Sequence, residues 1–220
     1  LVAGDNSQLT NNQIYSNGGA GIVVIGGTGN LISQNSIYAN GTSTAALGID
    51  LDATAADGDG ITVNDNGDID SGPNNLLNFP IIESAYLSGT TMIVKGWSRP
   101  GTTLEFFLTD ASEGTATSGD NQLGMSIDYG EGQTFLGSVV EGGGSDSDSG
   151  VSSYSGPDGN TDNTNAFEFS IPLAVSVAGG DMITATATLG SSTSEFSPVS
   201  TLNIPTVITN RGITYRVNRD

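Results

Sequence analysis

Carboxylate side chains are concentrated in one stretch of the sequence, residues 57–70, where they alternate with Gly and Asn. Calcium in proteins takes roughly six to eight oxygen ligands from carboxylates, amides and carbonyls on a flexible backbone. The candidate ligands are Asp57, Asp59, Asn64, Asp65, Asn66, Asp68 and Asp70. Their spacing does not match an EF-hand loop, and an acidic turn exposed to solvent is the alternative. The sequence therefore predicts calcium as the cofactor, bound by this loop.

The usual catalytic side chains are missing. The sequence contains no His and no Cys, so neither the commonest general base near neutral pH nor a thiol nucleophile is present. Asp50 and Asp52 lie two apart in a predicted strand and would point to one face, which is an arrangement that a glycosidase can use for its pair of carboxylates. Residues 1–80 contain no Lys or Arg that could act as the base of a lyase on acidic sugars. We therefore predict that the chain is not an enzyme, and that the Asp pair is solvated or binds calcium.

The charge of the chain excludes two classes of partner. There are 24 acidic and 5 basic residues, a net charge of -19. Such a charge repels nucleic acid and anionic membranes, and no apolar run is long enough to cross a bilayer. The first residue is Leu1, with no Met and no signal region, so we expect a processed chain or a fragment of a longer one. Neither nucleic-acid binding nor membrane insertion is expected.

The first part of the chain contains two copies of a short repeat. Residues 12–18 (NQIYSNG) return 23 residues later as residues 35–41 (NSIYANG), and residues 21–24 return as residues 48–51. A period in the low twenties, with short apolar strands and Asn or Gly corners, is typical of stacked β-coils. Asn residues at equivalent positions of successive coils can form a hydrogen-bonded ladder. Because coils are stabilised by their neighbours, the coil edge at Leu9 requires a partner, either upstream coils or another subunit.

The repeat N-x-I-Y-x-N-G followed by G-I-x-L resembles the right-handed parallel β-helix repeats of bacterial surface and secreted proteins. The block from residue 62 to residue 80 is similar to the way those helices terminate. The resemblance implies that residues 1–80 form β-helix coils with an acidic capping loop. It also implies an extracellular or cell-surface location, where surface glycans are candidate partners.

Residues 81–205 carry short strands without a repeat. The predicted strands are residues 81–87, 92–98, 103–109, 134–140, 167–171, 182–189 and 199–204. Seven short strands separated by Gly, Ser and Pro turns favour an antiparallel immunoglobulin-like sandwich. Residues 111–131 and 141–165 are rich in Gly, Ser and Asp, and we predict them as loops. Residues 129–137 and 181–197 are similar to a module that commonly follows bacterial β-helices.

The tail, residues 206–220, reverses the charge of the chain, since it holds three of the five basic residues. Apolar and polar side chains alternate in it with the period of a strand. This strand is predicted as the last strand of the sheet, as a frayed end, or as a strand donated to a neighbouring subunit or a secretion machine. The predicted assembly residues are Leu9, at the coil edge, and Arg211, Ile213, Tyr215, Arg216, Val217 and Arg219, in the tail.

The sequence thus predicts an all-β extracellular protein with a structural or adhesive function. Its parallel β-helix coils would be followed by the immunoglobulin-like sandwich, and it would self-associate as the subunit of a filament or surface fibre. The alternative is the non-catalytic C-terminal module of a secreted carbohydrate-active β-helix enzyme, whose active coils would lie upstream.

Overall fold

The computed structural model describes residues 1–43, 46–51, 60–109, 128–156, 161–210 and 213–217, and the last two strands by their backbone only. Within these ranges all regular elements are strands except η1 (Pro73–Leu76), a short turn in which Asn74 and Asn75 have left-handed backbones with φ 48° and 61°. The predicted all-β class is confirmed.

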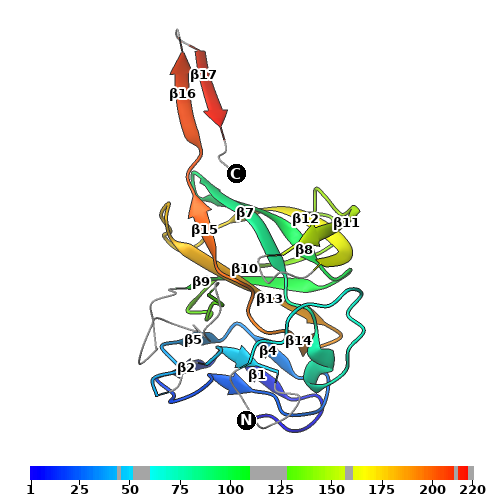
Figure 1. Cartoon of the computed structure of the whole chain (residues 1–220). Helices are drawn as coiled ribbons and strands as arrows, with labels where there is room; N and C mark the ends of the chain where they lie inside the picture. The colour runs from blue at the N-terminus through cyan, green and yellow to red at the C-terminus, as the bar shows by residue number, and fades with distance from the viewer. Residues whose placement is uncertain (44–45, 52–59, 110–127, 157–160, 211–212, 218–220) are drawn as a thin grey trace.

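Residues 1–51 form stacked turns of short parallel strands, drawn in blue in Figure 1. The strands are β1 (Gln8–Thr10), β2 (Gln13–Tyr15), β3 (Ile22–Val23), β4 (Leu31–Ser33), β5 (Ser36–Tyr38) and β6 (Ile49–Asp50). β1 pairs with β4, β2 with β5 and β3 with β6, all parallel. Leu9 lies beside Ile32 and Ile22 beside Ile49, so the offsets between the sequence copies are the offsets of the pairing.

Side chains at equivalent positions of the two turns bind one another. Asn12 Nδ2 donates to Asn35 Oδ1 at 2.9 Å, and Asn17 Nδ2 donates to Asn40 Oδ1 at 2.7 Å. Tyr15 stacks on Tyr38 with ring centroids 5.0 Å apart and an interplanar angle of 7°. The Asn residues therefore form the ladder that the repeat predicts, and they satisfy polar groups at the bends.

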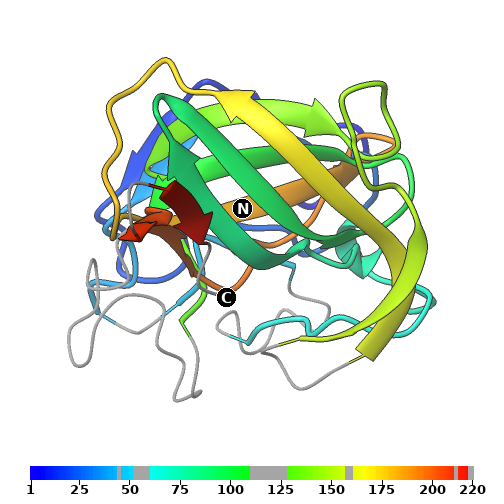
Figure 2. The same cartoon turned by 90° about the horizontal axis from the view of Figure 1, so that it is seen from above.

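The second part of the chain forms one mixed sheet with the order β10-β9-β13-β15-β7-β8-β12-β11, with β14 beside β13. Its strands are β7 (Ile81–Ser88), β8 (Thr91–Ser98), β9 (Thr103–Thr109), β10 (Thr134–Val140), β11 (Val151–Ser155), β12 (Thr161–Pro172), β13 (Met182–Leu189), β14 (Ser192–Thr193) and β15 (Ser200–Asn203). All seven predicted strands are present. β15 is antiparallel to β13 and parallel to β7, which joins the two halves of the sheet. Seen from above, the sheet curls so that its halves face each other (Figure 2).

The prediction of a loop over residues 141–165 was wrong in its second half. β11 and the start of β12 pair there as a hairpin. Tyr154 is buried and packs against Trp97 with ring centroids 5.6 Å apart, and Asp162 and Thr164 are buried as well. One aromatic anchor and alternating buried polar groups thus order a stretch whose composition is typical of a loop. Of the other predicted loop, residues 111–127 lie outside the described residues.

The stacked turns of residues 1–51, called the coils from here on, share an apolar core with the sheet. Ile22, Ile32 and Ile37 of the coils form one buried cluster with Phe107 and Phe196 of the sheet. A larger cluster fills the space between the two halves of the sheet. Burial of apolar area in the first cluster stabilises the coils against the sheet, and burial in the second holds the two halves of the sheet together.

The tail strand does not extend the sheet. β16 (Thr206–Asn210) and β17 (Ile213–Val217) form an antiparallel hairpin that pairs with no other described strand. In Figure 1 the hairpin projects from the body, and the coils lie at the opposite end of the molecule.

Candidate functional site

The structure brings three of the predicted calcium ligands together. One carboxylate oxygen from each of Asp65, Asp68 and Asp70 lies within 4.8 Å of the others. Asp65 and Asp68 are half-buried, and Asp70 is exposed. The other predicted carboxylates, Asp57 and Asp59, lie outside the described residues.

The two predicted amide ligands serve a different purpose. Asn64 is buried, donates to the Phe79 carbonyl at 2.9 Å and to Tyr154 Oη at 2.8 Å, and accepts the Phe79 N–H at 2.9 Å. Asn66 Oδ1 accepts the N–H of Asn163 at 3.2 Å. Both side chains therefore hold the acidic loop against the rest of the fold.

A fourth carboxylate, Asp162, fixes this loop from the side of β12. It accepts the Gly67 N–H at 2.9 Å and Asn78 Nδ2 at 3.3 Å. Arg99 pairs with the same carboxylate at 3.4 Å. Sequence reasoning missed this role because Asp162 lies in the stretch predicted as a loop.

The clustered carboxyl groups of Asp65, Asp68 and Asp70 repel one another when they are charged. Burial raises the pKa of Asp68, and Asp65 and Asp162 raise it further, against the backbone N–H of Asn78 and the charge of Arg99. Although Asp70 is exposed on the whole, partial desolvation of its carboxyl group, together with the charges of Asp65 and Asp68, raises its pKa to about 6. Protons or a cation would relieve the repulsion, and all-oxygen ligands favour a hard cation such as calcium.

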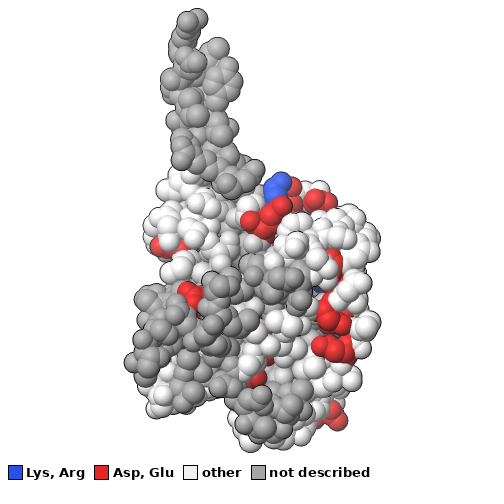
Figure 3. Space-filling model, in the orientation of Figure 1, with Lys and Arg blue, Asp and Glu red and all other residues white. Residues whose placement is uncertain are grey.

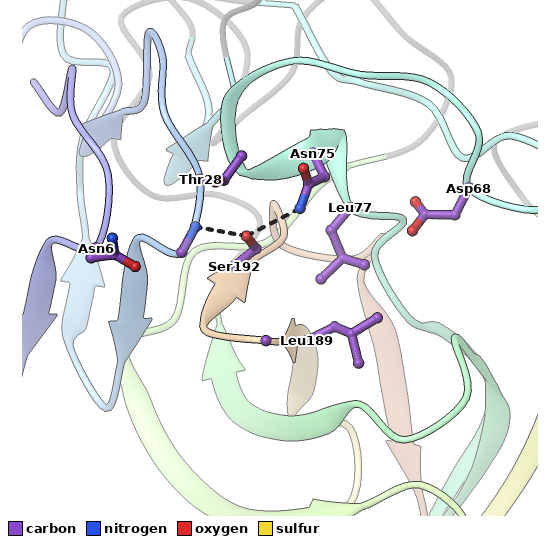
Figure 4. Close-up of a pocket in the computed structure, with 9 residues that line it drawn as sticks. Asn6, Thr28, Asp68, Asn75, Leu77, Leu189 and Ser192 are labelled. Carbon is purple, nitrogen blue, oxygen red and sulfur yellow. Dashed lines mark hydrogen bonds between the residues drawn. The ribbon is translucent and has the colours of Figure 1, made fainter.

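Asp68 also lines a pocket of about 340 Å³ where the corners of the coils meet the sheet (Figure 4). Asn6, Thr28, Asn75 and Ser192 supply amide and hydroxyl groups, and Leu77 and Leu189 supply apolar surface. Ser192 Oγ accepts the Gly29 N–H at 2.9 Å and Asn75 Nδ2 at 3.4 Å. The lining carries neutral hydrogen-bonding groups and a single carboxylate, which suits hydroxyl groups better than anions.

The sheet covers the C-terminal end of the coils in the place that a third coil would take. Along β4, Thr193 Oγ1 accepts the N–H of Ile32 at 3.0 Å. Along β5, the carbonyl of Gly132 accepts the N–H of Ile37 at 2.9 Å. Segments that are far apart in the sequence thus supply the hydrogen-bond acceptors that the next coil would otherwise supply.

Four buried side chains complete this cap. Each accepts a backbone N–H of the second coil: Glu105 Oε2 from Gln34 (3.0 Å), Glu131 Oε2 from Asn40 (3.1 Å), Glu195 Oε1 from Leu51 (2.8 Å), and Asn74 Oδ1 from Asn30 (3.0 Å). Asn40 Nδ2 also donates to Glu131 at 2.7 Å, so the Asn ladder ends on a carboxylate. Sequence reasoning missed these residues, although Glu105 in an apolar strand is a signal, because a buried acid needs hydrogen-bond donors.

Asp50, which we predicted to be solvated or to bind calcium, is buried at 1% exposure and is therefore not solvated. Glu195 accepts the next backbone N–H, that of Leu51, at 2.8 Å and the N–H of Thr62 at 2.9 Å. Burial raises the pKa of Glu195 to about 8, and Asp50 adds to the shift, against the two backbone N–H groups. Asp52 lies outside the described residues.

The opposite end of the coils is open. β1 and β2 each pair along one edge, and their other edges meet no strand of the described chain. Leu9 and Ile14 are partly exposed, whereas their equivalents Ile32 and Ile37 are 3% and 1% exposed. Tyr15 is 52% exposed on its free side. Within the described residues, this end offers apolar surface and strand edges without a partner strand, which is the kind of edge that accepts another strand.

The strand that holds the described assembly residues of the tail, β17, lies far from β1, which holds Leu9 (Figure 1). Ile213, Tyr215, Arg216 and Val217 belong to β17, and Arg211 and Arg219 lie outside the described residues. The structure does not bring the tail and the coil edge of one molecule together (Figure 1).

No protein-family model matches the chain. Among the residues that the structure describes, no helix is long and apolar enough to cross a membrane. Acidic side chains outnumber basic ones on the face in Figure 3.

Proposed function

We propose that the chain is an extracellular structural or adhesive protein that self-associates as the subunit of a filament or surface fibre. The observation that carries this proposal is the difference between the two ends of the coils. One end is closed by Glu105, Glu131, Glu195 and Asn74, whereas at the other end the outer edges of β1 and β2 meet no strand of the described residues. An end that leaves Leu9 partly exposed on a strand edge without a described partner favours contact with another polypeptide.

In this proposal the coils are those of a right-handed parallel β-helix, and the sheet is an immunoglobulin-like sandwich. The second assignment is supported by the strand order. β11-β12-β8-β7 corresponds to strands D-E-B-A of such a sandwich, and β10-β9-β13-β15 corresponds to C′-C-F-G. The parallel contact of β15 with β7 joins the two groups.

The burial and the hydrogen bonds of the acidic side chains at the junction support a structural role over a catalytic one. Asp50 and Glu195 are each 1% exposed, so a substrate cannot reach them. Glu105, Glu131 and Glu195 each accept backbone N–H groups at the junction. These contacts hold the cap in place.

Calcium is the cofactor that we propose for Asp65, Asp68 and Asp70. The support is the approach of three carboxylates within 4.8 Å and the repulsion among them. Surface glycans are the ligands that we propose for the polar pocket beside Asp68.

The test is the state of association of the full chain. We expect electron microscopy and sedimentation to show ordered oligomers, and Leu9→Asp to remove them while the far-ultraviolet circular dichroism is unchanged. Gln8→Asp adds the same charge at the neighbouring exposed position and should be milder. Dispersed wild-type particles at all concentrations would reject self-association and favour a terminal module of a larger enzyme. Repeating the experiment with a calcium chelator tests whether the ion contributes to the joint.

A further inference from the structure

The tail carries the strand–corner–strand pattern of the coils. Residues 208–213 (ITNRGI) align with residues 9–14 (LTNNQI) and residues 32–37 (ISQNSI). In each segment the two apolar residues stand five positions apart, and the Thr and Asn of the tail are identical to those of the first coil. In the coils these apolar residues are the ones that point into the core.

The corner residue fits the same alignment. The third residue of each coil segment adopts a left-handed backbone, with φ 58° at Asn11 and φ 53° at Gln34. Asn210 stands at this position in the tail, and Asn is among the residues that adopt this conformation most readily. The alignment departs at Arg211, which stands where Asn12 and Asn35 form the ladder. A coil built from the tail would therefore end the stack, because Arg211 cannot continue the ladder of Asn side chains.

Opening the hairpin formed by β16 and β17 should cost little free energy. β16 and β17 pair only with each other. An isolated two-stranded hairpin is marginally stable in water. On the open coil end the same strands would gain a partner edge and would cover Leu9 and Ile14.

The tail cannot reach the open coil end of its own molecule, because the two lie at opposite ends of the body (Figure 1). A contact between them must join two copies. Such a contact uses different surfaces on the two copies, and when it does not close into a ring it generates a filament.

We infer that the tail of one copy opens and forms an additional coil on β1 and β2 of the next copy, with Ile208 beside Leu9 and Ile213 beside Ile14. This inference rests on the proposed self-association and names its joint.

Cysteine pairs test the register directly, because the chain contains no Cys of its own. Thr10 is exposed, and Thr209 is its equivalent in the tail. Adjacent strands lie roughly 4.8 Å apart, which is within the range of Cα separations that a disulfide spans. We expect the double variant Thr10→Cys, Thr209→Cys to give a ladder of disulfide-linked oligomers on a non-reducing gel. The matched control Thr10→Cys, Thr214→Cys places the second thiol beyond the corner and should give at least tenfold less cross-linked product.

A second pair of variants tests the apolar contact. Ile208→Ser with Ile213→Ser should abolish assembly, whereas Val207→Ser, at the position equivalent to the exposed Gln8, should preserve it. Oligomers that persist without the specific cross-link, or after the double Ile substitution, would overturn the tail joint and leave self-association standing. A wild-type chain that stays monomeric would overturn both.

Discussion

Glu195 loses its contact with water on folding and gains two backbone donors, from Leu51 and Thr62. Burial outweighs these donors and raises its pKa from the ordinary 4.5 to about 8. Its contribution to stability is therefore fully present below about pH 4.5 and is lost as the pH rises towards 8. In the wild type, titration of Glu195 should raise the equilibrium constant for unfolding by up to about tenfold per pH unit over this range. We expect Glu195→Gln to remove this pH dependence. Urea unfolding across this range measures the difference from wild type, and Glu83→Gln, at an exposed site, should leave the profile intact.

Asp70 is the carboxyl group whose state should decide whether the acidic loop binds calcium. Its pKa of about 6 means that protons compete with the ion in mild acid. We expect Asp70→Asn to weaken calcium binding by at least about tenfold and to raise the melting temperature of the calcium-free protein, because a repelling charge is removed. Titration calorimetry at pH 7.5 and melting with a chelator measure the two effects. The control variant Asp148→Asn should bind calcium with the affinity of the wild type. If Asp70→Asn also binds calcium as tightly as the wild type, the proposed site is rejected.

At the scale of the elements, η1 acts as a cap because of one side chain. Asn74 is fully buried, accepts the Asn30 N–H and donates to the carbonyls of Asn30 and Thr193. Its φ of 48° is unfavourable for Ala. We expect Asn74→Ala to lower the free energy of unfolding by about 3 kcal/mol, because buried polar groups lose their partners. Asn203→Ala, at an exposed site, should change it by less than about 0.5 kcal/mol, and a similar loss in both variants would contradict the capping role.

The sequence was most informative where the chain is periodic. Equal spacing fixes which residues lie side by side, so the pairing of Leu9 with Ile32 and the ladder from Asn12 to Asn35 could be predicted from the repeat. The cap could not, because Glu131 and Asn40 meet through a fold whose segments have no common period. The acidic loop was predicted in part. Composition located its carboxylates, but the structural role of Asn64 depends on Tyr154, a residue from a distant hairpin.

At the scale of the whole molecule, the net charge of -19 opposes association, because every copy repels every other. The basic residues of the tail act in the opposite sense, but there are only three of them in the last ten positions. The overall repulsion should therefore dominate at a distance, while apolar contacts at the coil end decide the joint itself.

We accordingly expect the oligomeric fraction to grow as NaCl rises from 10 to about 150 mM, because the screening length falls from roughly 30 Å to roughly 8 Å. Sedimentation velocity at a fixed protein concentration measures that fraction. A chain shortened by residues 206–220 should stay monomeric at every salt concentration and keep its melting temperature, since β16 and β17 pair with no other described strand. If salt instead dissolves the wild-type oligomers, attraction between the basic tail and the acidic body is the stronger force, and the joint is held by charge in place of apolar contact.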